Sequence, residues 1–332
     1  MRARLFSYAD VLSGEDVERN KQGESGKNMK KIGMIGIGAM GHSVAENILL
    51  QGWNMVLYDI RPEAYRDLLD RGAEGSESPE QLGQQTDTVL VMVNTYAHCQ
   101  NVVEHLLKTF ENGTIILLST ISADDVKALE KRAAAKNCRV VDCPVSGGTA
   151  GAKAGALTVM AGCPDDTLSE ILPLLKCFGT KIFHVGQNVG DGQTMKAINQ
   201  LLVGIHMCAA AEAFNLATQS GMDLDLVYDV ICSGAGMSRI FENRGKFLID
   251  RDFSTRSTLQ IQLKDTTIAC ETAEAAGAPA FLANTARELF QIALNRYPAM
   301  DDSIEVVRVY ETLSKNQPQS INQNRSRNNG LN

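Results

Sequence analysis

The sequence predicts an α/β fold, a doubly wound parallel sheet followed by an all-α C-terminal domain with a long central helix. Short β-branched runs alternate with helical stretches from Lys31 onward. A glycine-rich turn separates the first of these runs from the first helical stretch, and the pattern becomes purely helical after Gly190. Near-continuous apolar strands separated by helices are typical of parallel sheets covered on both faces.

Apolar runs of strand length follow one another at regular intervals in the first half of the chain. The segments predicted as buried strands are Ile32–Ile37, Met55–Tyr58, Thr88–Val93, Thr114–Leu118 and Arg139–Val141. The intervening segments predicted as helices include Ser43–Gln51, Pro62–Arg71 and Ala123–Lys136. We expect Asp142 to close the last strand of the sheet.

The segment Asp191–Ser220 predicts one long helix, because it contains no proline and, beyond Gly192 at its start, a single internal glycine, Gly204. At 1.5 Å per residue such a helix would span about 45 Å. Its apolar residues surround most of its circumference, which is typical of a buried helix. Further helical patterns continue to Leu313. We therefore expect a cofactor domain at 29–190 and a helical substrate and oligomerisation domain at 191–315.

Composition limits the possible partners. Of 332 residues, 44% are hydrophobic and 21% charged, with a net charge of −7, which argues against nucleic acid or an anionic membrane as the main partner. Eight cysteines show neither CxxC nor metal-ligand spacing, so we expect buried thiols, no metal and a cytoplasmic location. We expect no apolar stretch of membrane-spanning length.

The two ends of the chain lack the periodicity of a folded domain. Residues 1–28 have no apolar centre for a secretion signal, and their acidic residues disfavour a mitochondrial transit peptide. We interpret them as a loose extension. Residues 316–332 are rich in Asn, Gln and Ser and predict a disordered tail.

A GxGxxG turn lies between the first strand and the first helix. Its residues are Gly36, Ile37, Gly38, Ala39, Met40 and Gly41. Such a turn lets pyrophosphate approach the backbone at a helix N-terminus, as in a Rossmann-type domain. Asp59 lies 23 residues after Gly36 and could bind the adenosine ribose hydroxyls, favouring NAD over NADP, although Arg61 could bind a 2′-phosphate. Alternatively, the glycines make a tight turn and Asp59 caps the next helix.

Two further segments carry polar groups suited to an anionic substrate. Ser146, Gly147 and Gly148 form a turn whose backbone N–H groups suit a carboxylate, or else an ordinary loop. Lys196, Asn199 and Gln200 share one face of the predicted long helix and need a partner or a cavity. Lys196 could act as a base if its pKa is lowered, or its side chain could extend to solvent.

From Lys31 to Leu313 the chain resembles the β-hydroxyacid dehydrogenase family. The resemblance lies in the glycine turn, Ser119-Thr120, Asp142–Gly148, Gly155-Ala156-Leu157, Gly190–Lys196 and Lys264-Asp265. It implies an NAD-dependent oxidation of a small anionic hydroxy acid. The roles it implies are catalysis for Lys196, substrate binding for Ser146, Gly147, Gly148, Asn199 and Gln200, and cofactor binding for Thr120 and Lys264.

Two positions depart from several family members. Val93-Asn94 replaces Leu-Pro in the cofactor loop, and Gln200 stands where 3-hydroxyisobutyrate dehydrogenases usually carry Asn. Val93-Asn94, with Phe241–Arg244 and Asp252–Ser257, is most similar to the L-threonate dehydrogenase branch. The alternatives are oxidation of 3-hydroxyisobutyrate, reduction of tartronate semialdehyde, or a non-catalytic binding protein, against which Lys196 argues. The apolar helical domain predicts self-association.

Overall fold

The computed structural model describes residues 4–6, 31–298 and 301–315. The chain divides into two compact units, Met1–Lys196 and Ala197–Asn332, which we call the strand–helix unit and the helical unit. The predicted tail at 316–332 lies outside the described residues, as does most of the predicted extension at 1–28. Within that extension, residues Arg4–Phe6 form a short strand that the sequence did not predict.

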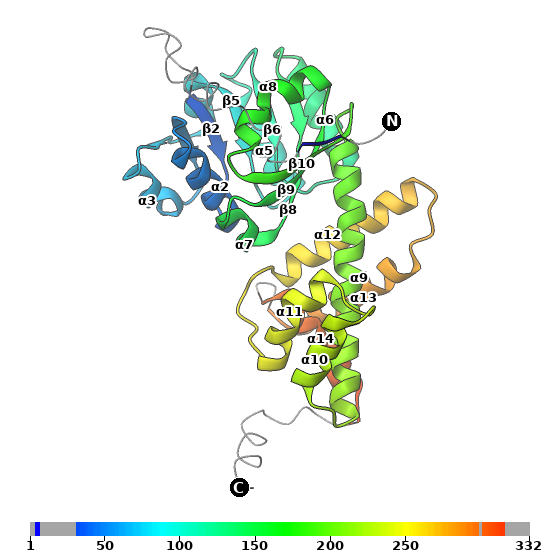
Figure 1. Ribbon diagram of the computed structural model, residues 1–332. Coiled ribbons are helices and arrows are strands. Elements are labelled where there is room, and N and C mark those ends of the chain that lie inside the picture. Colours follow the sequence, from blue (N-terminus) through cyan, green and yellow to red (C-terminus); the bar gives the residue numbers. More distant parts are fainter. Residues whose placement is uncertain (1–3, 7–30, 299–300, 316–332) are drawn as a thin grey trace. The chain divides into compact units, whose positions relative to one another are not determined.

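The strand–helix unit is built on one sheet with the order β1-β10-β9-β7-β6-β5-β2-β3-β4, and β8 pairs with β9 off this path (Figure 1). The strands are β1 (Arg4–Phe6), β2 (Lys31–Ile35), β3 (Met55–Tyr58), β4 (Glu74–Gly75), β5 (Thr86–Val91), β6 (Thr114–Leu117), β7 (Arg139–Asp142), β8 (Val145–Ser146), β9 (Leu157–Gly162) and β10 (Gly179–Gly186). From β4 to β7 every pairing is parallel, which confirms the predicted doubly wound arrangement.

The expectation that Asp142 closes the last strand is wrong. Strands β8, β9 and β10 follow it, and β9 pairs antiparallel with both β7 and β8 but parallel with β10. β10 was missed because Lys181 and its neighbour Thr180 are exposed and interrupt the apolar run. The sheet is therefore parallel over most of its width and antiparallel where β9 meets β7 and β8 and where β1 meets β10.

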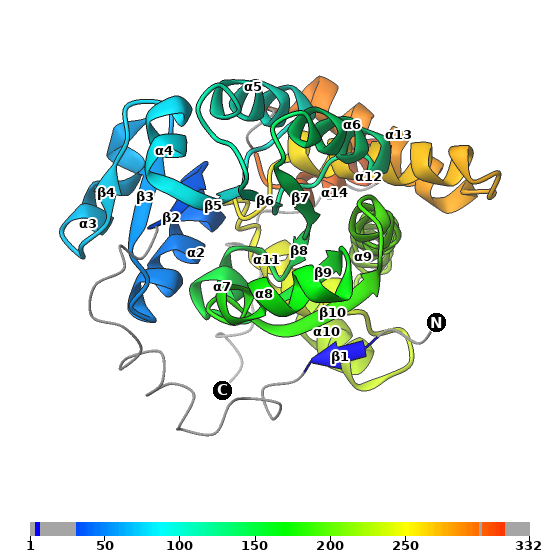
Figure 2. The same cartoon turned by 90° about the horizontal axis from the view of Figure 1, so that it is seen from above.

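Helices cover both faces of this sheet, as Figure 2 shows. One face carries α2 (Ala39–Leu50), α7 (Gly148–Lys153) and α8 (Asp165–Leu175), and the other carries α4 (Pro79–Gln85), α5 (Tyr96–Leu106) and α6 (Ala123–Ala134). Alternate residues of the strands enter different cores: Ile116 packs with the α2 side, whereas Ile115 and Leu117 pack with the α4 side. This alternation follows from the two-residue period of a strand.

The helices begin where local sequence satisfies their first N–H groups. Ser122 caps α6 by accepting from the Asp125 N–H, and the Asp125 side chain returns a bond to the Ser122 N–H. The short helices η2 (Pro62–Tyr65) and α3 (Arg66–Leu69) begin with Pro62 at the first helical position. These signals are local, so the predicted helix starts lie within a few residues of those observed.

The described part of the helical unit consists of helices joined by loops. It contains the larger part of α9 (Asp191–Gln219), then α10 (Leu224–Ser233), α11 (Arg239–Asp250), α12 (Leu259–Ala275), α13 (Phe281–Arg296), η3 (Ser303–Val306) and α14 (Val307–Leu313). Its core includes Phe290 and a stacked pair, Phe214 and Phe241, with ring centroids 5.0 Å apart. The stack joins α9 to α11.

Helix α9 is less buried than the sequence predicted. Ile198, Leu202 and Leu216 are exposed, so one side of the helix is apolar without being covered. By length and composition α9 could also cross a membrane, contrary to expectation, because its charged residues are widely spaced. The core helix of a soluble protein can have the same length and composition. The buried polar side chains of Gln193 and Gln200 are consistent with a core helix of this kind.

Candidate active site

The glycine turn has the geometry that a dinucleotide phosphate needs. Gly36 has a φ of +93°, and a Cβ there would collide with the Met92 carbonyl oxygen. A Cβ at Gly41 would collide with the Gly36 carbonyl oxygen, so the helix packs tightly on the turn. A Cβ at Gly38 would meet nothing within 4 Å, and Gly38 is the N-cap of α2. The open side of the turn therefore faces the uncapped helix start, where phosphate binds in this fold.

Asp59 follows β3 and is nearly buried. Its Oδ2 accepts the Ile37 N–H at 2.8 Å, and its Oδ1 accepts the Arg61 N–H at 2.9 Å. The carboxylate thus fixes the glycine turn as well as facing the ribose position that the fold predicts. Arg61 is exposed, with its Nε 3.6 Å from Asp59 Oδ1. The structure brings Asp59 and the turn together, which the spacing had predicted.

The loops after β5 and β6 bring the next cofactor candidates to the same edge of the sheet. Val93 and Asn94 follow β5, and Thr120 follows β6. The Val93 N–H donates to Ser119 Oγ at 2.8 Å, which ties the two loops together. Because β2, β3, β5 and β6 are parallel, their carboxyl ends meet at one edge, the usual ligand site of such sheets.

The turn predicted to hold a carboxylate has two glycines in left-handed backbone conformations. Gly147 has a φ of +139° and Gly148 a φ of +64°, and both residues are exposed. A Cβ at Gly147 would lie 2.9 Å from Leu157 Cδ2, whereas a Cβ at Gly148 would meet nothing within 4 Å. The backbone at Ser146–Gly148 is therefore open to a small anion.

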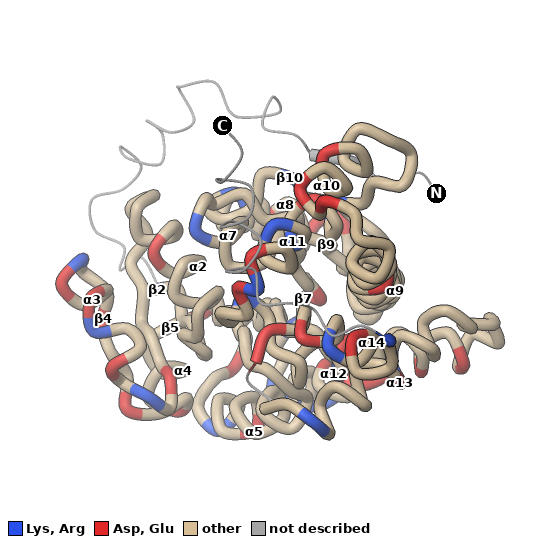
Figure 3. The backbone as a smooth tube through the Cα atoms, turned by 90° about the horizontal axis from the view of Figure 1, so that it is seen from below, with Lys and Arg blue, Asp and Glu red and all other residues tan. Residues whose placement is uncertain are grey.

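Lys196 is buried, with only 6% of its surface exposed. It is the only Lys or Arg in α9, whose tube is largely tan in Figure 3. The alternative in which its side chain simply extends to solvent is therefore wrong. Lysine is rarely buried in proteins, so the burial of Lys196 at the polar start of an apolar helix suits a chemical role.

In the helical unit, the predicted substrate amides are joined to the predicted cofactor lysine through Asp265. Asn199 Nδ2 donates to Gln200 Oε1 at 2.8 Å, and Gln200 Nε2 donates to Asp265 Oδ2 at 2.6 Å. The other carboxylate oxygen, Asp265 Oδ1, lies 2.8 Å from Lys264 Nζ. Two adjacent residues of opposite charge could form an ordinary surface pair, but Asp265 is buried. Only its tertiary partner, 65 residues away, reveals its role.

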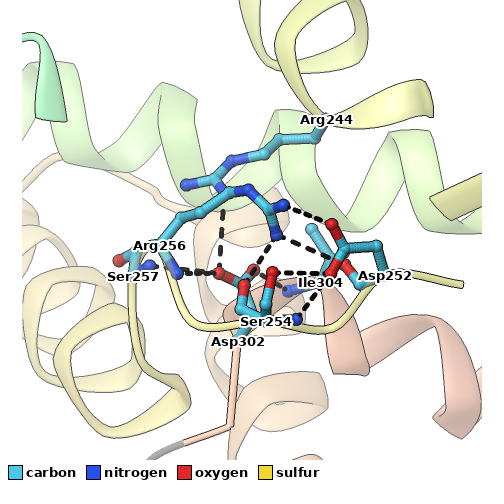
Figure 4. Close-up of polar contacts among 7 residues, drawn as sticks. All are labelled: Arg244, Asp252, Ser254, Arg256, Ser257, Asp302 and Ile304. Atoms are coloured by element: carbon cyan, nitrogen blue, oxygen red, sulfur yellow. Dashed lines mark hydrogen bonds and ion pairs between the residues drawn. The ribbon is translucent and has the colours of Figure 1, made fainter. Parts of the chain in front are cut away.

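Arg244 and Arg256 of the helical unit contact acidic and aromatic side chains and do not lie on a fully solvated face. Arg256 lies 3.4 Å from the centre of the Phe247 ring and donates to Asp252 Oδ2 at 2.5 Å (Figure 4). Arg244 is 16% exposed, and its Nη1 lies 3.6 Å from Asp302 Oδ2. Burial lowers the pKa of the Arg244 guanidinium. These arginines are parts of a buried polar cluster.

Two further histidines have carboxylate partners. His105 pairs with Glu80 at 2.7 Å, which holds the pKa of Glu80 down to about 2, and His42 pairs with Asp67. Six of the eight cysteines are buried and the other two half-buried. Within residues 4–6, 31–298 and 301–315, no group of three or more His, Cys, Asp or Glu residues is placed to hold a metal ion.

Comparison with known proteins covers both units. Residues 31–186 match the family described as the NAD binding domain of 6-phosphogluconate dehydrogenase. Residues 190–310 match the family described as the NAD-binding domain of NADP-dependent 3-hydroxyisobutyrate dehydrogenase. The chain is 33% identical to an L-threonate dehydrogenase of Pectobacterium atrosepticum over 288 residues, covering 85% of this chain and 95% of that protein. The chain is also 33% identical to an L-threonate dehydrogenase of Cupriavidus necator, and this match covers 85% of this chain and 96% of that protein.

A solved structure shows the same fold. The 3-hydroxyisobutyrate dehydrogenase from Salmonella typhimurium has a TM-score of 0.79 and 32% identity, covering 84% of this chain and 99% of that one. The sheet, the glycine turn and the helical unit together define an NAD-binding dehydrogenase that acts on CH–OH groups. The chain belongs to the β-hydroxyacid dehydrogenase family.

Proposed function

We propose that this enzyme oxidises the C2 hydroxyl of L-threonate or a related four-carbon sugar acid, with Lys196 as the acid/base residue. The observation that carries the proposal is the burial of Lys196 at the start of α9. The L-threonate dehydrogenases reported above, each 33% identical to this chain over 85% of its length, support the substrate class.

Each polar group then has a defined task. When bound, NAD accepts the hydride that leaves the carbinol carbon. Lys196 removes the hydroxyl proton in that direction and returns it in the reverse direction. The exposed backbone at Ser146–Gly148 holds the substrate carboxylate. That anchoring fixes which carbon the lysine reaches.

The amides favour a substrate that bears several hydroxyls. Gln200 uses one N–H on Asp265 and its oxygen on Asn199, which leaves its second N–H to donate to the substrate. A methyl group at that place would leave the buried amide unpaired, at about 1–3 kcal/mol, or roughly ten- to hundred-fold in kcat/KM. We therefore expect higher kcat/KM for L-threonate than for 3-hydroxyisobutyrate.

The cofactor is NAD, and we propose that NADP is used less well. Asp59 places a carboxylate at the ribose position, where it would repel a 2′-phosphate. Arg61 is exposed and already lies 3.6 Å from that carboxylate, so it is partly neutralised. We propose that the cofactor contacts Asp59 and the glycine turn Gly36–Gly41, together with Val93, Asn94, Thr120 and Lys264.

The test is a steady-state assay of L-threonate, 3-hydroxyisobutyrate and, in the reducing direction, tartronate semialdehyde, with NAD(H) and NADP(H). Lys196→Ala should lower kcat by about 10²–10⁴ while NADH still binds. The exposed Lys181→Ala serves as the matched lysine control and should retain activity. Full kcat in Lys196→Ala would reject the mechanism.

Three alternatives remain distinct outcomes of the same assay. Preference for 3-hydroxyisobutyrate would reject the sugar acid but keep the family and Lys196, and the Salmonella typhimurium structure of that name favours this second candidate. Tartronate semialdehyde reduction would be the third outcome. Absence of turnover with every acid would favour a binding protein on a dehydrogenase scaffold.

We also propose that the enzyme is a cytoplasmic homo-oligomer, with a cofactor domain at 29–190 and a substrate and oligomerisation domain at 191–315. The exposed apolar residues Ile198, Leu202 and Leu216 on α9 support self-association. Light scattering coupled to size-exclusion chromatography would test it, and a strictly monomeric protein at micromolar concentration would contradict it.

A further inference from the structure

Gln193 joins three segments of the strand–helix unit that the sequence analysis did not connect. It is the third residue of α9 and is 1% exposed. Its Oε1 accepts the Ile121 N–H at 3.1 Å, and its Nε2 donates to the Ser119 carbonyl oxygen at 3.0 Å. Its second Nε2 bond goes to Asp142 Oδ1 at 2.9 Å. Both N–H groups of the amide and its oxygen are thus engaged.

Asp142 holds the same helix start from the opposite side. It ends β7, is fully buried, and its Oδ2 accepts the N–H groups of Gly190 and Gln193, each at 2.9 Å. A carboxylate is a strong acceptor for N–H groups at a helix N-terminus, where it also meets the positive end of the helix dipole. The first turn of α9 is therefore fastened to β7 through both main-chain and side-chain bonds.

The glycines before Lys196 permit this close approach. A Cβ at Gly192 would lie 2.7 Å from the carbonyl oxygens of Asp142 and Met160, and Gly190 has a φ of +104°. Any larger residue at Gly192 would push the helix away from the strands. The GxGxxxK pattern at Gly190–Lys196 thus has a packing reason that spacing alone did not provide.

We propose that Asp142 and Gln193 form a positioning relay that sets Lys196 in register with the cofactor loops, without touching substrate or cofactor themselves. Gln193 binds the residues on either side of Thr120, and Ser119 Oγ continues the chain to the Val93 N–H. Lys196 lies three residues after Gln193 in α9, and residues with this separation are neighbours on the surface of a helix. The relay rests on the proposed function, because it assigns Thr120, Val93 and Lys196 their roles.

The charge of Asp142 supports positioning over simple packing. Burial raises the pKa of Asp142 to about 6, although bonds from Gln193 and Gly190 oppose that rise. Asp142 is therefore ionised at neutral pH, although burial disfavours its charged form. Packing alone would be served by a neutral residue, whereas accepting three N–H donors at once is best done by a carboxylate.

The test removes the amide while keeping its shape. Gln193→Met is nearly isosteric, and Asp142→Asn provides a second variant if the first fails to fold. Each should lower kcat ten- to hundred-fold with the best hydroxy acid of the panel, because small misplacements of reacting groups cost that much. The NADH Kd, measured by fluorescence, should change less than about threefold, and the isotope effect on kcat with C2-deuterated substrate should rise. These magnitudes follow from loss of positioning with binding retained.

Gln262→Met is the matched control, because Gln262 is also buried, and its amide donates to Thr266 one turn later in the same helix, α12. It should lower the melting temperature and leave kcat and the isotope effect unchanged. In a Lys196→Ala background, measured by single turnover at high enzyme concentration, Gln193→Met should lower the residual rate less than about threefold.

The outcomes separate the relay from the proposed function. Wild-type kcat in a folded Gln193→Met or Asp142→Asn variant would overturn the relay, as would equal fold losses with and without Lys196. Full activity of Lys196→Ala would instead reject the proposed function. An inactive Lys196→Ala enzyme together with an unaffected Gln193→Met enzyme would refute the relay alone.

Discussion

The strand–helix unit and the helical unit bury polar side chains in different ways. In the strand–helix unit, the side-chain oxygen and nitrogen atoms of Asp59, Asp142 and Gln193 all take part in hydrogen bonds. In the helical unit, several buried polar atoms, such as Arg244 Nη1 and Asp265 Oδ1, lie in ion pairs without hydrogen-bond geometry. Among the residues that the structure describes, the buried side-chain atoms lacking a hydrogen bond are Arg244 Nη1, Asp265 Oδ1, Ser303 Oγ, Glu305 Oε2 and Arg308 Nε.

All of those atoms belong to the helical unit, and the difference has a physical basis. A sheet edge presents backbone N–H and C=O groups that side chains of the loops can use, whereas helices satisfy their backbone internally. Buried charges between helices therefore depend on one another. The interior of the helical unit should be more sensitive to loss of a single charge, and the interior of the strand–helix unit more sensitive to pH at Asp142.

The largest expected effect is at Asp302. Asp302→Ala would leave Arg244 without its nearest carboxylate and remove the acceptor of the Arg256, Ser257 and Ile304 N–H groups. Breaking one side of a buried pair costs about 3–5 kcal/mol. Urea unfolding would measure it, with Asp302→Asn as the neutral acceptor control of intermediate stability. A loss below about 1 kcal/mol would show that the cluster contributes little.

The next effect is the pH dependence of Asp142. Its pKa is raised from 3.8 to about 6, so the native state binds the proton more tightly than the unfolded chain. The stabilisation is present below pH 4 and is lost as pH rises through about 6, by about 3 kcal/mol at 1.36 kcal/mol per pKa unit. Burial raises the pKa of the Cys143 and Cys163 thiols, and the charge of Asp142 adds a smaller contribution in the same direction.

Asp142→Asn removes this titration. The difference in unfolding free energy, wild type minus variant, should therefore fall between pH 4 and pH 7 in urea titrations. A difference that stays constant over that range would show that the carboxyl titrates near its ordinary pKa. A difference that rises would mean that the hydrogen bonds outweigh desolvation.

A smaller, functional effect is expected at Asp265. Asp265→Asn retains an acceptor for Gln200 but removes the charge that lies 2.8 Å from Lys264 Nζ. We expect kcat/KM to fall about tenfold, equivalent to about 1.4 kcal/mol. Glu271→Gln, an exposed change on the same helix, is the control. A kcat/KM within twofold of wild type would contradict the role of Asp265 in orienting these side chains.

The smallest effect compares helix caps, which should not differ between the units. Ser122 caps α6 and Ser238 caps α11, and both are half-buried. Each serine-to-alanine variant should lose about 1 kcal/mol of stability in thermal unfolding. A much larger loss in one unit would mean that the contrast extends beyond buried charges.

Much of the fold could be predicted because its signals are local. The strand Met55–Tyr58 matches the prediction residue for residue, and α6 starts where Ala123 was expected. Buried strands and helix caps depend on neighbours within a few positions. By contrast, β9 and β10 depend on partners distant in sequence, and the exposed side of α9 depends on tertiary packing.

The candidate site divides in the same way. Gly36–Gly41, Asp59 and Lys196 carry patterns of fixed spacing, and the structure gives them the predicted positions in the fold. Asp142, Gln193 and Asp265 lie within segments of the family resemblance, but the sequence did not show their roles, because each acts through a partner 48 to 74 residues away. From the sequence alone, a buried Asp or Gln cannot be distinguished from an ordinary polar residue until its partner is known.

The short strand β1 has a consequence for solubility. It pairs antiparallel with Phe183 and the residues on either side of it in β10, where the sheet would otherwise end. An uncovered strand presents a row of backbone N–H and C=O groups to any other chain, which favours intermolecular strand addition and aggregation. A shorter protein that begins at Met29 would keep both cores yet expose this row. Three residues that take no part in the candidate active site thus help to keep concentrated enzyme in solution.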